Sequence, residues 1–176
     1  MTRHLYFAFG MNMDPETMDY LPGPPIPLGR ACLPDWGLRM RAFADIEEAP
    51  GEVVYGVLWE LTPEALLRLD QREGYQPGGF GMYDRREVTV LDRDGQPEKA
   101  IVYFMTDRSR EWTQRPASEH YLGMLRQGYA HFGHGPEAVA SMEKAQADAT
   151  PPRTFWDDFH DHYPDGLARH PDAEED

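Results

Sequence analysis

A carboxylate at the end of a predicted helix is the first candidate for chemistry. Glu73 lies in the segment 69–74, which follows a clear helix start at Thr62 and Pro63. The carbonyl end of a helix carries partial negative charge, so a carboxylate there is disfavoured in its ionised form. A pKa raised in this way suits a general acid or base that works near neutral pH. The same position also fits an ordinary solvated glutamate beside Arg72.

A glycine loop between a short apolar run and a helix start is the second candidate. The loop consists of Phe9, Gly10, Met11, Asn12 and Met13. A loop in this position can direct several backbone N–H groups at one point, and glycine allows a ligand to approach the backbone closely. Such a loop can bind an anion, although a plain strand-to-helix turn fits the same residues.

Histidines and a single cysteine are the other groups with reactive chemistry. His160 and His162 are two residues apart, so they point to opposite sides of a strand and share no face of a helix. Neither this pair nor the pair His131 and His134 has a third ligand at a recognisable spacing. We therefore expect no metal site. Cys32 has no histidine near it in the sequence, which favours a buried structural thiol over a nucleophile.

The hydrophobic pattern predicts the elements that must position these groups. We expect strands at 5–9, 36–43, 53–61, 87–91 and 100–105, the last two joined as a hairpin. We expect helices at 15–18, 63–73, 117–132 and 136–148. The helix at 63–73 has an apolar stripe of Leu66, Leu67 and Leu69, and the prolines in 21–27 exclude regular structure there. This order predicts an α+β fold with a mixed, strongly curved, barrel-like sheet and flanking helices.

Length and charge narrow the class of protein. The chain has 176 residues, 40% of them hydrophobic, which is enough for one domain with a true core. It carries 17 basic and 31 acidic residues, a net charge of -14, which argues against a nucleic-acid partner and against an anionic membrane. A single cysteine excludes an intrachain disulfide, and no long apolar segment occurs. We expect a cytoplasmic protein.

The last part of the chain differs from the rest. Residues 151–176 hold eight acidic residues and two arginines, so six of the fourteen net negative charges lie there. We expect a single domain over residues 1–150 and an acidic, partly flexible extension over 151–176. Phe155 and Trp156 in this extension fit either a subunit contact or an anchor, which leaves a monomer or a homodimer open.

Six segments, taken in order, resemble the gamma-glutamylcyclotransferases. Residues 6–13, YFAFGMNM, resemble the opening strand and loop of this family, and residues 69–74, LDQREG, resemble the segment with its catalytic glutamate. The other four matches are the strand 52–59, the segment 81–83, the strand 102–106 and Tyr121. The resemblance covers residues 4–145 and implies a compact α+β fold around a mixed β-barrel.

The resemblance also implies a reaction, the release of 5-oxoproline from a γ-glutamyl compound. The α-amine of the substrate attacks its own γ-carbonyl, closes a five-membered ring and expels an amine or amino acid. By resemblance, Glu73 is the general acid/base, and the N–H groups of Gly10, Met11 and Asn12 hold the substrate carboxylate or the developing oxyanion. No cofactor is implied, and the partner is a small γ-glutamyl substrate.

Two tyrosines match the family, and two loop residues do not. Tyr83 and Tyr121 correspond to tyrosines that border the family's pocket and can donate hydrogen bonds. The family's loop tyrosine is Phe9 here and its serine is Met11, so two hydroxyls are lost and a bulky thioether is gained. His120 also departs from the family pattern, as a possible added polar contact.

Three substrate or function readings therefore stay open. The first is a cyclotransferase for a small γ-glutamyl amide, with local cations among Arg72, Arg85 and Arg86 offsetting the acidic charge. The second is a cyclotransferase for a γ-glutamylamine or a γ-glutamyl-tagged metabolite. The third is a small-ligand binding module that keeps the fold without turnover.

Overall fold

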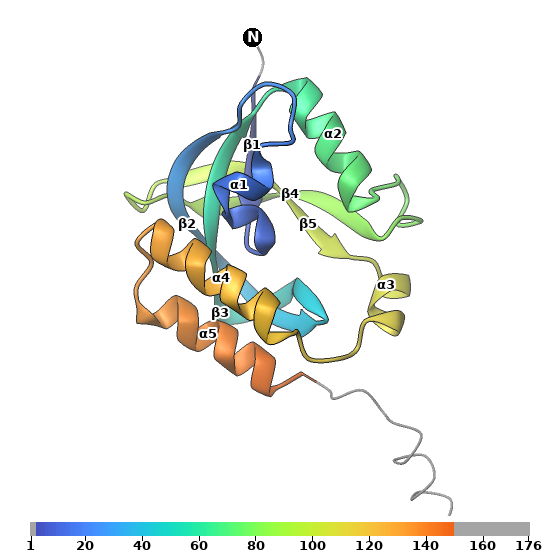
Figure 1. The fold of residues 1–176 in the computed structure, drawn as a ribbon, viewed down its shortest axis with the longest axis vertical. Coiled ribbons are helices and arrows are strands. Elements are labelled where there is room, and N and C mark those ends of the chain that lie inside the picture. The colour runs from blue at the N-terminus through green and yellow to red at the C-terminus, as the bar shows by residue number, and fades with distance from the viewer. Residues whose placement is uncertain (1–2, 150–176) are drawn as a thin grey trace, which may run out of the picture.

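The sheet closes on itself into a barrel. The computed structural model describes residues 3–149. The strand order is β1-β3-β2-β4-β5; β1 runs parallel to β5, and the other neighbours are antiparallel. The strands are β1 His4–Ala8, β2 Ile26–Arg41, β3 Phe43–Leu61, β4 Tyr83–Leu91 and β5 Pro97–Met105. The predicted α+β fold with a mixed, barrel-like sheet is confirmed (Figure 1).

Short helices flank the barrel. They are the 3-10 turn η1 Met11–Met13, α1 Pro15–Met18, α2 Pro63–Glu73, α3 Asp107–Trp112, α4 Glu119–His131 and α5 Pro136–Ala147. Helices α4 and α5 lie side by side, with α5 against β2 and α4 against η1 (Figure 1). Helix α4 and η1 approach each other closely: a Cβ atom on Gly128 of α4 would lie only 2.9 Å from the Cβ of Met13. Helix α4 therefore braces the glycine loop from outside the barrel.

Strands β2 and β3 form one long hairpin that the sequence did not fully reveal. The predicted strands 36–43 and 53–61 are only parts of it, and the segment 21–27, predicted to be irregular, already contains the first two residues of β2. The strand pairing shifts register near Pro27 and Pro34, so the hairpin tolerates these prolines. At such a bulge the residue does not need a backbone N–H to hydrogen-bond the neighbouring strand. The hairpin reverses at Ala42, which has a φ of 61°.

Helix α2 begins and ends where its capping residues predict. The Thr62 side chain accepts a hydrogen bond from the Ala65 N–H, and Pro63 occupies the first turn. Gly74 ends the helix in the left-handed conformation, at φ 65°. The expected apolar stripe is wrong at one position: Leu66 and Leu69 are buried, whereas Leu67 is 61% exposed. These caps fix Glu73 as the last residue of the helix.

The remaining elements agree with the pattern except for one helix. The 83–105 hairpin and the helices α1, α4 and α5 lie within a few residues of their predicted bounds. Helix α3, six residues long and capped by Thr106, was not predicted, since one and a half turns carry no measurable periodicity. No helix in residues 3–149 is long and apolar enough to cross a membrane. The predictions for the 151–176 extension, including His160, His162, Phe155 and Trp156, lie outside the described residues.

Candidate active site

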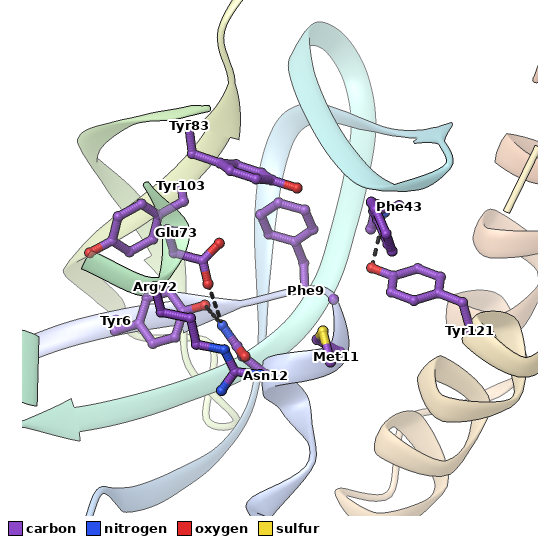
Figure 2. Close-up of a pocket in the computed structure, with 12 residues that line it drawn as sticks. Tyr6, Phe9, Met11, Asn12, Phe43, Arg72, Glu73, Tyr83, Tyr103 and Tyr121 are labelled. Carbon is purple, nitrogen blue, oxygen red and sulfur yellow. Dashed lines mark hydrogen bonds between the residues drawn. The ribbon is translucent and has the colours of Figure 1, made fainter. Parts of the chain in front are cut away.

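One cavity beside the barrel contains the predicted catalytic glutamate and all six predicted substrate-binding residues. Its volume is about 210 Å³. The predicted residues in its wall are Phe9, Gly10, Met11, Asn12, Glu73, Tyr83 and Tyr121. They come from the end of β1, η1, α2, β4 and α4, so segments more than a hundred residues apart meet here (Figure 2).

Glu73 enters this cavity from the end of α2 and is held by one hydrogen bond. Asn12 Nδ2 donates to Glu73 Oε1 at 2.9 Å, and no partner for Oε2 is found among the described residues. Burial raises the pKa of Glu73, while the hydrogen bond from Asn12 and the charge of Arg72 act in the opposite direction. The expected direction is confirmed, although burial, not the helix end, is its largest cause. One carboxylate oxygen is thus fixed and the other is available.

The Asn12 side chain has a role in the site that the sequence did not indicate. Its Nδ2 also donates to the Tyr6 hydroxyl at 3.0 Å, so both amide hydrogens are used within the site (Figure 2). The orientation of the amide follows from its partners, because an ionised Glu73 requires an N–H on its side. Asn12 Oδ1 is left buried without a partner in residues 3–149, which costs about 1–3 kcal/mol. The fold bears this cost while placing a donor on Glu73.

The glycine at the start of η1 allows a close approach by a tyrosine from α4. A Cβ atom on Gly10 would lie 2.9 Å from the Tyr121 hydroxyl, which is too short for a side chain without movement. The same hydroxyl accepts a hydrogen bond from the Ala44 N–H at 3.0 Å. Gly10 is therefore required for contact between the loop, α4 and the β2–β3 hairpin.

The two predicted pocket tyrosines, Tyr83 and Tyr121, stay protonated at neutral pH. Burial raises the pKa of Tyr121 to about 12, against the lowering effect of hydrogen bonds from the Ala44 and Met11 backbone. Burial also raises the pKa of Tyr83, and the nearby charge of Glu73 adds to this shift. Each hydroxyl therefore keeps its proton and can donate it in a hydrogen bond to a ligand.

The cavity also contains residues that sequence reasoning did not place there. They are Tyr6, Phe43, Ala44, Arg72 and Tyr103. Arg72 had been considered only as a nearby cation; its guanidinium donates to the Thr17 carbonyl at 3.2 Å and lies 4.2 Å from the centroid of the Tyr20 ring. Tyr103 donates to Asp70 Oδ1 at 2.6 Å. The sequence signal that could have placed Tyr6 and Tyr103 in the site is that both are tyrosines on apolar strands that are neighbours in the barrel, since a buried phenol needs a polar partner.

Three other expected contributors lie elsewhere. Arg85 pairs with Asp70 at 2.7 Å and Arg86 pairs with Glu48 at 2.5 Å, so these two cations are already neutralised and do not line the cavity. His120 is exposed at the start of α4 and does not line the cavity either. The proposed polar contact from His120 is therefore wrong.

His134 and Cys32 line a second, separate pocket. His134 Nε2 lies 2.8 Å from the Gly56 carbonyl, and burial lowers the pKa of its imidazole. Cys32 is half-buried, not fully buried as expected, and burial raises the pKa of its thiol, the reverse of what activates a nucleophile. No group of three or more potential metal ligands is found within residues 3–149.

Comparisons with known proteins agree on one family. The family model described as "Gamma-glutamyl cyclotransferase, AIG2-like" matches residues 6–123. A gamma-glutamylcyclotransferase of Bos taurus is 29% identical over 141 residues, covering 73% of this chain and 71% of the relative. The Homo sapiens gamma-glutamylcyclotransferase is 31% identical over 91 residues, covering 52% of this chain and 45% of the relative.

Solved structures show the same fold. A structure named gamma-glutamyl cyclotransferase superposes with a TM-score of 0.68 at 24% identity, over 88% of this chain and 92% of that one. YkqA from Bacillus subtilis superposes with a TM-score of 0.68 at 22% identity, over 86% of this chain and 57% of that one. At these identities the superpositions establish the barrel architecture.

Proposed function

Because the chain belongs to the gamma-glutamyl cyclotransferase, AIG2-like family, a family of enzymes, we propose that it releases 5-oxoproline from a small γ-glutamyl amide. The observation that carries this proposal is the placement of Glu73. Its carboxylate is half-buried in the cavity, one oxygen is held by Asn12, and the other has no hydrogen-bond partner within residues 3–149. A single carboxylate with one free oxygen is what an internal proton transfer needs.

In the proposed reaction the substrate attacks itself. The neutral α-amine forms a bond to the γ-carbonyl carbon, and the bond from that carbon to the amide nitrogen breaks. One proton leaves the attacking nitrogen and one proton joins the departing nitrogen, so the products are 5-oxoproline and a free amine. Attack within one molecule has a high effective concentration, so the protein has only to fold the substrate and move the proton.

Glu73 makes both proton transfers in this proposal. Its ionised form takes the proton from the attacking amine, and the resulting acid returns it to the leaving nitrogen. A pKa raised by burial serves both steps, because the carboxylate then binds a proton more readily than an ordinary glutamate does. The bond from Asn12 keeps Oε1 in place, so the transfer uses Oε2.

The loop and the tyrosines stabilise charge in this scheme. Gly10, Met11 and Asn12 line the cavity, and in this scheme their backbone N–H groups bind the substrate carboxylate or the oxyanion that forms at the γ-carbonyl. The protonated hydroxyls of Tyr83 and Tyr121 add donors at the wall. These local donors outweigh the net charge of -14, because fields of distant charges are screened over about 8 Å.

The proposal is tested by 5-oxoproline release from a panel of γ-glutamyl dipeptides. We expect wild type to be active and Glu73→Gln to lose at least about 100-fold in kcat, the scale of a general acid/base. Glu64→Gln is the matched control, since Glu64 lies in the first turn of the same helix and does not line the cavity. Equal rates for wild type and Glu73→Gln would remove Glu73 from the mechanism.

A further inference from the structure

The cavity has a polar end and an apolar end. Glu73, Asn12 and Arg72 lie together at one end, whereas Met11, Phe43 and the ring of Tyr121 lie at the other (Figure 2). A γ-glutamyl group carries an ammonium and a carboxylate, which cannot be buried without polar partners. In the proposed reaction this group therefore occupies the polar end, and the leaving amine extends toward the apolar end.

Phe43 is the most unusual residue of the apolar end. It is 47% exposed at the turn of the β2–β3 hairpin, and its ring packs edge-on against Tyr121 with a centroid distance of 5.3 Å. A large apolar side chain exposed at the opening of a cavity is a signal of binding, because exposure there does not contribute to the core. Part of the Phe43 side chain is therefore open to contact with a ligand in the cavity.

The backbone on both sides of Phe43 is held in place. The Ala44 N–H donates to the Tyr121 hydroxyl at 3.0 Å, and the Ala42 N–H donates to the Arg115 carbonyl at 2.6 Å. The next residue, Asp45, is fully buried and bonded to Arg41 and Arg110. Because this wall is already ordered, binding of a ligand does not cost the conformational entropy of ordering it.

The loop opposite Phe43 is apolar as well. Met11 and Phe9 occupy the positions at which the family pattern has a serine and a tyrosine, so two hydroxyls that could bind a polar ligand are absent. Phe9 is 7% exposed, which leaves Met11, a flexible thioether, to adapt to the ligand. A polar side chain on the leaving amine would lose water at this wall and gain no hydrogen bond from these side chains.

We propose that Phe43 and Met11 form a subsite for the leaving group and select γ-glutamyl amides whose amine carries an aliphatic or aromatic side chain. This inference rests on the proposed function and specifies its substrate class. Phe43 acts through contact with the part of the substrate that departs, so its effect falls on the choice of substrate and leaves the proton transfer to Glu73.

The test compares kcat/KM for γ-Glu-Leu and γ-Glu-Phe with that for γ-Glu-Asn and γ-Glu-Ala. Leucine and asparagine side chains have nearly the same shape and differ in polarity, so this pair isolates the apolar contact. We expect wild type to prefer γ-Glu-Leu over γ-Glu-Asn by about 10- to 100-fold, the range that apolar pockets give. Phe43→Ala is expected to bring this ratio close to one, and Phe43→Leu to retain part of it.

Phe80→Ala is the control, since Phe80 is 75% exposed and lies outside the cavity. It is expected to leave the Leu-to-Asn ratio unchanged. A wild type without preference for the apolar substrates, or a ratio that Phe43→Ala leaves unchanged, would overturn this inference while the cyclotransferase proposal stands. No turnover of any of the four substrates would overturn the proposed function, and this inference with it.

Discussion

Removal of the Asp45 carboxylate is a severe perturbation that the structure allows us to scale. Asp45 has no exposed side-chain surface, and its Oδ2 accepts hydrogen bonds from Arg41 at 2.6 Å and from Arg110 at 2.9 Å. Its Oδ1 accepts from the Met105 N–H at 2.8 Å. The carboxylate thus joins the turn of the β2–β3 hairpin to the end of β5 and to α3. Asp45→Ala leaves two half-buried guanidinium groups and a backbone N–H without their shared acceptor.

The loss of one partner from a buried ion pair costs about 3–5 kcal/mol. For a protein of this length, each kcal/mol lowers Tm by about 2–4 °C, so we expect a fall of roughly 6–20 °C. Thermal unfolding followed by circular dichroism measures this directly, and urea unfolding at 25 °C gives the free energy of unfolding independently. The turn that carries Phe43 depends on the same cluster, so activity is expected to fall with stability.

Asp107→Ala is a control matched in residue type and in partner. Asp107 pairs with the same Arg110 at 3.5 Å, but its side chain is 99% exposed. Exposed pairs contribute little because water and salt screen them, so its Tm is expected to stay close to that of wild type. A Tm for Asp45→Ala within about 2 °C of wild type, or equal losses in both variants, would refute the reasoning from burial.

Two further predictions concern the environment of Glu73. Asn12→Ala removes the hydrogen bond that lowers the pKa of Glu73, so the acid limb of the kcat/KM profile is expected to move to higher pH. The value of kcat is expected to fall by about 10-fold or more. If the acid limb does not move, Asn12 does not position Glu73. Burial raises the pKa of Glu73 in the folded chain above its value in the unfolded chain, so the folded chain binds the Glu73 proton more tightly. Stability is therefore lost as the pH rises from the unfolded pKa through the folded pKa. Glu73→Gln is therefore expected to have the higher Tm near about pH 8 and the same Tm as wild type near about pH 4; a Tm difference independent of pH would contradict this assignment.

The sequence was sufficient for those parts of the molecule that depend on local chemistry. Thr62, Pro63 and Gly74 define α2 through its caps, and these caps place Glu73 at the helix end. The hairpin around residues 92–95 follows from its turn residues in the same way. Closure of the barrel is a different matter, since the parallel pairing of β1 with β5, with Tyr6 opposite Ile101, joins segments 95 residues apart.

The parts of the site that escaped prediction depend on contacts between distant residues. The Asn12 side chain reaches Glu73, 61 positions later, and Tyr121 reaches Ala44, 77 positions earlier. Phe43 was expected to end a strand, whereas it begins one, because Ala42 makes the turn with a positive φ that its residue type does not announce. Leu67 fitted an apolar stripe by type and faces solvent because α2 packs on one side only. Local pattern identified the groups, and only tertiary structure showed their partners.

The central claim is that the substrate cyclises on itself, and the fate of solvent oxygen tests it most directly. The measurement is mass spectrometry of the products formed from a γ-glutamyl dipeptide in H₂¹⁸O. Our account predicts 5-oxoproline without ¹⁸O from the reaction step, released together with an equal amount of free amino acid, because the γ-carbonyl keeps its own oxygen. Glutamate that carries ¹⁸O in its γ-carboxylate would show attack by water and would contradict the account.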